Sequence, residues 1–170
     1  MTDNEPARTA AFGTLEVRLA GRADASAVTA LLHELGYPSN TDKEVTGRLA
    51  RWSGRDDLLV LVAADGQQIV GVAALAVVPY FERPGCWGRV VALVVDARAR
   101  GVGVGRQLLA ATEQAALVRG CVRMEISCAR HRTGAHAFYR SVGYSDRCDE
   151  AARFLKDLVP GTSDRMPASR

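Results

Sequence analysis

Residues Arg89–Gln114 read RVVALVVDARARGVGVGRQLLAATEQ, and the other elements of the chain can be placed relative to this stretch. The apolar run Val90–Val95 is typical of a buried strand. Glycines alternate after it at Gly101, Gly103 and Gly105, and an amphipathic helical pattern follows. Backbone N–H groups in such a loop, together with the positive end of the helix dipole, attract a negatively charged group. The stretch therefore predicts an anion-binding site between a strand and a helix.

The composition is that of one soluble globular domain. The chain has 170 residues, of which 48% are hydrophobic and 24% charged, enough to bury a core without disulfides or metal. Its net charge of +3 is mild, and no basic run with interleaved aromatic residues occurs, so we expect no nucleic acid partner. Residues 1–13 and 160–170 are rich in small and polar residues, and we expect both to be disordered. Residues 14–159 then form a single domain.

Neither targeting signals nor metal motifs are evident. The segment MTDNEPARTAAF is polar and acidic, unlike a signal peptide, and no apolar run is long enough to span a bilayer. The four cysteines, Cys86, Cys121, Cys128 and Cys148, form no CxxC pair and lie at no zinc-finger spacing from a histidine. We therefore expect a cytoplasmic protein with free thiols, no metal and no membrane partner.

Five elements are predicted before the glycine stretch. They are a strand from Leu15 to Leu19, a helix capped by Asp24 and ended by Gly36, a helix capped by Thr41 with Glu44, a strand from Leu58 to Ala64, and a strand from Ile69 to Val78. Asp65 and Gly66 are a hairpin turn signal, so the last two strands should pair antiparallel. Pro79–Gly88 is predicted to be a loop.

Further elements follow the glycine stretch. Val122, Met124 and Ile126 alternate as a strand, with Glu125 on its opposite face. Because a helix intervenes, this strand should run parallel to Val90–Val95. A short helix at Thr133–Val142 and closing strands at Tyr144–Cys148 and Ala151–Leu158 complete the prediction. The fold class is α/β, an α+β hybrid in which a mixed sheet has helices on both faces.

The glycine loop has more than one interpretation. A P-loop requires GxxxxGK[ST], which the chain lacks. A dinucleotide fingerprint would use Gly101 and Gly103, but its third glycine is replaced by Arg106, which is too large for close helix–strand packing. Glu125 lies where a ribose-binding acid would sit, which supports a dinucleotide, whereas the short chain after Cys128 argues against a doubly wound domain.

A family resemblance supplies a third interpretation. The segment Arg100–Gly105 matches the [Q/R]xxGx[G/A] element of the GNAT acyltransferase superfamily and directly follows a strand, as it does there. Arg132–Tyr139, followed by Gly143 and Tyr144, resembles the family's N/RxxAxxFYxxxGF/Y segment. Two motifs in the right order on the predicted elements are a specific signal, and the resemblance extends over roughly Leu15 to Leu158. It implies a mostly antiparallel mixed sheet with a central parallel strand pair.

The resemblance also implies acetyl-CoA as the co-substrate, with no metal. The residues expected to hold its pyrophosphate are Gly101, Val102, Gly103, Val104, Gly105 and Arg106, with added charge from Arg100. The backbone of Leu93, Val94 and Val95 would pair with the pantetheine arm, and one N–H there would polarise the thioester carbonyl. Arg132 replaces a family asparagine and, having no acceptor atom, is expected to reach a phosphate or a surface acid.

Catalytic roles follow from the same comparison. Tyr139 matches the family tyrosine that protonates the leaving thiolate, so it is the expected general acid. Several family members have a glutamate base early in the central strand, but the matching position here is about Arg89, which cannot be a base. Glu125 and Glu82 are the substitutes considered, with Glu125 the preferred one, and a water chain could replace either.

The acceptor is expected to be a primary amine of a small molecule. By resemblance it lies near the loop between the first two helices, and the candidate contacts are Tyr37, Tyr80 and Glu82. Acetylation of a protein or peptide amine is an alternative, as is a non-catalytic acyl-CoA-binding or sensor module on the same fold. A homodimer is common in the superfamily and is compatible with this sequence.

Overall fold

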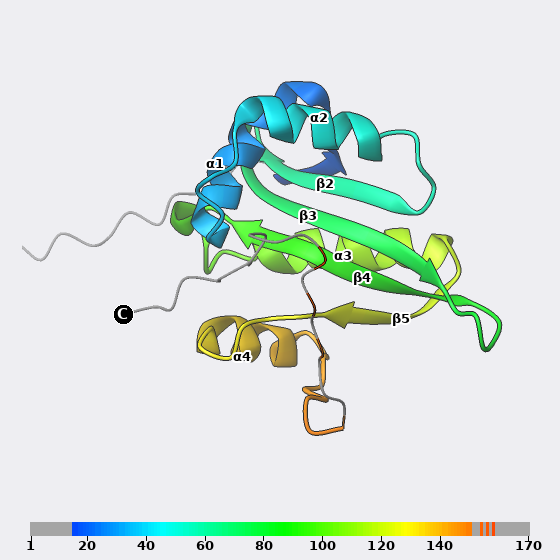
Figure 1. The fold of residues 1–170 in the computed structure, drawn as a ribbon. Coiled ribbons are helices and arrows are strands. Elements are labelled where there is room, and N and C mark those ends of the chain that lie inside the picture. The colour runs from blue at the N-terminus through cyan, green and yellow to red at the C-terminus, as the bar shows by residue number, and fades with distance from the viewer. Residues whose placement is uncertain (1–14, 151–153, 155, 157, 159–170) are drawn as a thin grey trace, which may run out of the picture.

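The computed structural model describes residues 15–150, together with 154, 156 and 158 (Figure 1). Its elements, in chain order, are β1 Leu15–Leu19, the 3-10 turn η1 Arg22–Asp24, α1 Ala25–Leu35, α2 Asp42–Trp52, β2 Leu58–Asp65, β3 Gln68–Pro79, β4 Cys86–Val95, the 3-10 turn η2 Ala97–Ala99, α3 Val104–Val118, β5 Cys121–Ile126 and α4 Thr133–Ser141.

The strands form one mixed sheet in the order β1-β2-β3-β4-β5. β1 to β4 pair antiparallel, whereas β4 and β5 pair parallel, because the crossover through α3 returns the chain to the same end of the sheet. The β2–β3 hairpin closes between Asp65 and Gln68. Gly66, with φ of 58°, takes the first central position of this turn, where a residue with a side chain would be strained.

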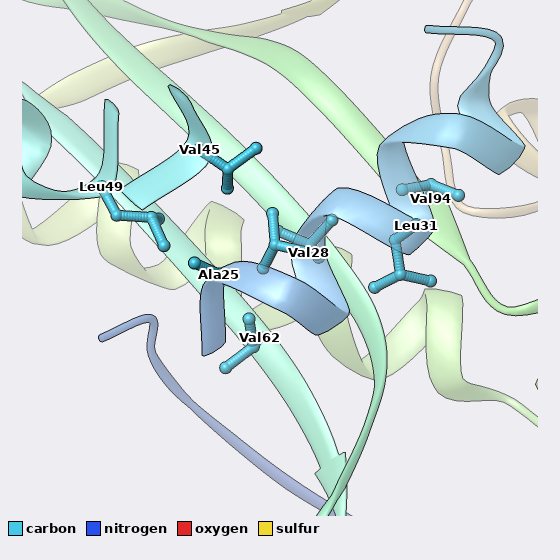
Figure 2. Packing of buried hydrophobic residues seen from close by; sticks show 8 residues of the cluster. Ala25, Val28, Leu31, Val45, Leu49, Val62 and Val94 are labelled. Atoms are coloured by element: carbon cyan, nitrogen blue, oxygen red, sulfur yellow. The ribbon is translucent and has the colours of Figure 1, made fainter. Parts of the chain in front are cut away.

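Helices cover both faces of the sheet (Figure 1). On one face α1 and α2 pack on β2, β3 and the end of β4, forming a core of Ala25, Val28, Leu31, Val45, Leu49, Val62, Val72 and Val94 (Figure 2). On the other face α3 packs along the sheet, where Leu108 is fully buried among residues of β2 and β3. The predicted fold class, including the parallel pair, is confirmed.

Two predictions about the ends of elements differ from the structure. β4 begins at Cys86, so the predicted loop ends at Gly85; Gly88 and Arg89 had hidden the start of the strand because they interrupt the apolar run. Asp24 is the N-cap residue of α1, but its side chain makes no capping bond to this helix: the carboxylate accepts from the Gly21 N–H at 2.7 Å and from Arg18. Within the described residues, no helix combines the length and hydrophobicity needed to cross a bilayer.

The predicted strand Tyr144–Cys148 was also wrong. The Tyr144 N–H donates to the Tyr139 carbonyl at 3.0 Å, which folds this segment back onto the end of α4. Further along, the Cys148 N–H donates to the Asp146 carboxylate at 3.1 Å, an arrangement typical of a turn. The other predicted closing strand, Ala151–Leu158, lies largely outside the described residues. In the described part of the sheet, β5 therefore pairs with β4 alone.

Candidate active site

β4 and β5 separate halfway along β4. Their parallel pairing ends where Val90 lies opposite Ile126, whereas β4 continues to Val95 and there pairs with β3 alone among the described strands. On the side facing away from β3, no described strand pairs with Leu93, Val94 or Val95, and the Val95 carbonyl accepts from the Arg100 side chain at 3.0 Å; we call this side the free edge of β4. The family resemblance predicted that the pantetheine arm of acetyl-CoA pairs with this edge.

A β-bulge lies at the start of this free edge. Leu75 pairs with Val90 and Ala74 with Ala92, so Val91 is an extra residue on β4, and 49% of its surface is exposed. A bulge of this kind bends the strand and increases its twist. Its position immediately after the last rung to β5 accounts for the separation of the two strands.

The glycine loop presents open backbone to solvent. Gly101 and Gly103 have φ of 81° and 94°, and a Cβ built at either would meet no atom within 4 Å. Gly103 is the N-cap of α3, and the first helical bond recorded there runs from the Gln107 N–H to the Gly103 carbonyl. The first-turn N–H groups of Val104, Gly105 and Arg106 are therefore available to an anion.

Gly105 has a different role, which concerns packing. A Cβ there would lie 3.5 Å from the Phe138 ring and 3.6 Å from Val95. The start of α3 therefore packs closely against both α4 and the end of β4. Val102 is exposed and Val104 is buried, so the loop alternates between solvent and core.

The arginines around the loop differ in their partners. Arg98 binds Asp96 at 2.6 Å, and Arg100 donates to the Val95 carbonyl at 3.0 Å and to Glu34 at 3.2 Å. Arg106 is exposed, and no side-chain hydrogen bond or ion pair is recorded for it within the described chain. Arg106 is thus the loop arginine whose guanidinium is available to a phosphate, whereas Arg100 fixes the loop to β4 and α1.

Asp96 shapes the turn from β4 into the loop. Its carboxylate accepts from the Arg98 backbone N–H at 2.8 Å and from the Arg98 guanidinium, which together lower the pKa of Asp96 to about 2 despite its burial. Glu34, on α1, accepts from the Ala97 N–H at 3.0 Å. The sequence predicted neither of these contacts. That of Asp96 had a local signal, since aspartate at such a turn bonds the backbone two residues on; the contact of Glu34 with the turn had none.

Tyr139 is half-buried on α4 and stays protonated at neutral pH. Burial raises the pKa of its phenol to about 12, a nearby Cys128 adds to the rise, and the Arg132 charge opposes it. Its ring lies 6.1 Å from that of Tyr144, whose hydroxyl donates to Glu113 on α3 at 2.8 Å. Tyr139 thus provides a protonated phenol on α4, the helix that follows β5.

Arg132, at the N-terminus of α4, makes no ion pair with an acid among the described residues, and its expected contact with a phosphate stays a prediction. Its guanidinium donates to the Leu35 carbonyl at 3.2 Å, at the C-terminal end of α1. A cation there also interacts favourably with the negative end of the α1 dipole. The contact joins α4 to α1, two elements that lie on either side of the end of β4.

The candidate base Glu125 lies next to the strand opening. It pairs in register with Arg89, one rung before the last rung of β4 and β5, and the two side chains approach to 3.7 Å. Both side chains are partly exposed, at 33% for Arg89 and 45% for Glu125, so this ion pair is weak.

The structure separates the three predicted acceptor residues. Tyr37 follows α1, whose end contacts Arg100 and Arg132 near the glycine loop. Tyr80 and Glu82 lie in the β3–β4 loop, at the opposite end of the ten-residue strand β4, which spans roughly 30 Å. There Arg83 stacks on the Tyr80 ring at 3.9 Å and approaches Glu82 at 3.9 Å. Tyr37 alone of these three lies at the glycine-loop end.

A separate groove of about 370 Å³ lies between α1 and the β2–β3 turn. Its three acids are already paired, Asp24 with Arg18, Glu34 with Arg100 and Asp96 with Arg98. None of its lining residues belongs to the glycine loop or to the free edge of β4, so it is not the site that these elements form.

Comparison with known proteins places this geometry in a family. The sequence model of the acetyltransferase (GNAT) family matches residues 27–144, which include the glycine loop, the strand opening and Tyr139. The chain belongs to the GNAT acetyltransferase family. Glucosamine 6-phosphate N-acetyltransferase 1 of rice (Oryza sativa subsp. japonica) is 36% identical over 94 residues, a match spanning 54% of this chain and 55% of the rice protein.

Solved structures share the GNAT fold. Glucosamine-6-phosphate N-acetyltransferase from Arabidopsis thaliana has a TM-score of 0.73 at 22% identity and covers 86% of this chain and all of that one. An aminoglycoside N-acetyltransferase in complex with CoA has a TM-score of 0.74 at 17% identity, covering 86% of this chain and 96% of that one. At these identities the likeness concerns the fold.

Proposed function

We propose that this GNAT protein transfers the acetyl group of acetyl-CoA to a primary amine of a small molecule, by direct attack within a ternary complex. The observation on which this depends is the combination of three features: a free β4 edge, an open glycine loop at its end, and a protonated tyrosine on the element after β5. Together they can hold a long anionic thioester and supply the proton that its leaving group requires.

The residues present fit the co-substrate. The pyrophosphate would lie against the first-turn N–H groups of α3, where the open space at Gly101 and Gly103 admits it and Arg106 adds charge. The backbone at Leu93 to Val95 would pair with the amides of the pantetheine arm, as an added strand does. Gly105 could not be enlarged freely, because Phe138 and Val95 already lie close to it.

The chemistry is then acyl transfer between two nucleophiles. The acceptor nitrogen attacks the thioester carbonyl carbon, and an N–H of the free β4 edge stabilises the oxyanion that forms. Collapse breaks the carbon–sulfur bond, and Tyr139 donates its proton to the CoA thiolate. Glu125 takes the proton that the acceptor nitrogen loses, directly or through water. Holding both reactants together supplies much of the rate.

The acceptor class is supported by the relative rather than by the site alone. The rice protein is named for an amino sugar phosphate, a small molecule with a primary amine. The structure offers no feature that favours a peptide amine over a small one. A non-catalytic acyl-CoA sensor on the same fold is the competing function, because the proposed base Glu125 is paired with Arg89.

The test is a panel of acceptors assayed for CoA release, combined with thermal unfolding in the presence of acetyl-CoA, CoA or NAD. We expect acetyl-CoA and CoA to raise the melting temperature and NAD to leave it unchanged, because a ligand of the native state stabilises it. Amino sugars should release CoA faster than peptides with free N-termini. Binding of acetyl-CoA without release for any amine would favour the sensor, and stabilisation by NAD alone would overturn the proposal.

A further inference from the structure

The sheet face on which an acceptor can approach bears arginines. α3 packs against all five strands on one face, which closes that side. On the other face α1 and α2 cover β2, β3 and the end of β4, where Val94 joins their core. The first half of β4 and the neighbouring β5 lie beyond these helices (Figure 1). An acceptor that reaches the strand opening therefore approaches across this part of the sheet.

The orientation of the side chains on this face follows from their neighbours. A Cβ at Gly88 would lie 3.3 Å from Ala116 of α3, so the alternating residues Trp87 and Arg89 point to the opposite face. Met124 packs into the cluster beside α3, so Arg123 and Glu125 also point away from it. The 3.7 Å contact between Arg89 and Glu125 agrees with this assignment.

These residues place one acid and two cations in a defined pattern. Glu125 is the single acid in β4 and β5. Arg123 precedes it by two residues on β5, a spacing of roughly 6–7 Å along the strand, and pairs in register with Trp87, next to Arg89. Arg123 is exposed, and no side-chain partner is recorded for it in the described chain.

Building on the proposed function, we infer that the acceptor is an amine that also bears an anionic group, such as a phosphate or carboxylate, held by Arg123 and Arg89 while Glu125 faces the amine. The weak Arg89–Glu125 pair exchanges its partners when such an acceptor binds: the ammonium takes the place of Arg89 at Glu125, and the freed guanidinium turns to the anion. The side chains of Arg123 and Glu125 leave the strand roughly 6–7 Å apart, so both can reach a single small molecule.

The experiment compares matched acceptors that differ in the anion. Affinities of the CoA-loaded protein are measured by calorimetry for three pairs: glucosamine 6-phosphate and glucosamine, phosphoethanolamine and ethanolamine, and glycine and glycinamide. We expect the preferred anionic amine to bind at least tenfold more tightly than its counterpart without the anion, as charge-assisted hydrogen bonds at a partly exposed site allow. In Arg123→Gln this ratio should fall below threefold, because the variant loses affinity for the anionic amine.

Arg22→Gln is the matched control, because Arg22 is an exposed arginine in η1, which follows β1 at the opposite edge of the sheet from β5. It should keep the tenfold ratio. Equal affinities within every pair, or an undiminished ratio in Arg123→Gln, would overturn the inference even if amines without an anion release CoA. Tight binding of the anionic amine without CoA release would instead leave the anion site standing and contradict the proposed transfer.

Discussion

The hydroxyl of Tyr144 donates a 2.8 Å hydrogen bond to the carboxylate of Glu113, which joins the segment after α4 to the middle of α3. Burial and this acceptor both raise the pKa of Tyr144, so the bond persists throughout the neutral range. Tyr144 also packs against the Tyr139 ring and donates its N–H to the Tyr139 carbonyl. The pair therefore positions Tyr139 relative to α3 and the glycine loop.

Tyr144→Phe tests this positioning role. Loss of the hydrogen bond leaves the Glu113 carboxylate without its partner, and we expect the free energy of unfolding to fall by about 1 kcal/mol. Turnover should fall about tenfold with the KM for acetyl-CoA nearly unchanged, because the reacting phenol is displaced while the phosphate site is intact. The separate variant Glu113→Gln, whose amide oxygen can still accept the bond from Tyr144, should keep most of the wild-type turnover. Equal losses in both variants would contradict a role through this hydrogen bond.

Gly103→Ala tests the open glycine loop. At φ of 94° an alanine is strained by about 1–2 kcal/mol, so the loop must shift. We expect the affinity for acetyl-CoA, measured by calorimetry, to fall at least tenfold. Gly47→Ala is the control: Gly47 lies inside α2 with no atom near its Cβ position, so alanine should stabilise that helix by about 0.5–1 kcal/mol and leave affinity unchanged. An unaltered affinity in Gly103→Ala would show that the loop does not bind the co-substrate.

Arg106→Gln tests whether Arg106 is the loop arginine that contacts the pyrophosphate. Because Arg106 is proposed to contact the pyrophosphate, the variant should bind acetyl-CoA about tenfold more weakly, and the loss should shrink in high salt. Acetyl-pantetheine, which lacks the pyrophosphate, should bind wild type and variant equally. Arg51→Gln, another exposed arginine, on α2, serves as the control. A matching loss with acetyl-pantetheine would place the effect elsewhere than at the phosphates.

Asp96 makes the stability of the folded protein depend on pH. Its folded-state pKa of about 2 lies below the ordinary value of 3.8, so its contribution to stability is fully present above about pH 4 and disappears as the pH falls towards 2. Asp96→Asn should therefore lower the melting temperature at pH 6 and have little effect at pH 2. Thermal unfolding of both proteins at the two pH values checks this. A difference that is the same at both values would mean that the charge of Asp96 does not stabilise the turn.

Local sequence signals predicted much of this structure. The capping box of α2 was readable because both bonds are local: the Glu44 N–H donates to the Thr41 hydroxyl at 3.3 Å and the Thr41 N–H to Glu44 at 3.0 Å. The contact of Glu34 with Arg100 could not be predicted from the sequence, because 66 residues separate them and only the packing of α1 beside the end of β4 brings them together. Tyr144 suggested a strand because aromatic residues favour strands, but its hydrogen bond to Glu113 holds it against α3 instead.

Arg132 shows the same limit within the candidate site. Its place in the family motif predicted a ligand contact, which stays a prediction, but it could not predict that the guanidinium donates to the Leu35 carbonyl, 97 residues away in sequence. A motif fixes the position of a residue along its own helix. The partner that its side chain meets depends on the neighbouring element, which the motif does not contain.

The most direct test of the account is Tyr139→Phe, measured as kcat with the best acceptor of the panel and as the Kd for acetyl-CoA. The change removes the hydroxyl that would protonate the thiolate and keeps the ring that packs beside Phe138 and Tyr144. We predict that kcat falls at least 100-fold, the range of general acid catalysis, while the Kd changes less than threefold. A kcat equal to that of the wild type would contradict the assignment of Tyr139 as the general acid.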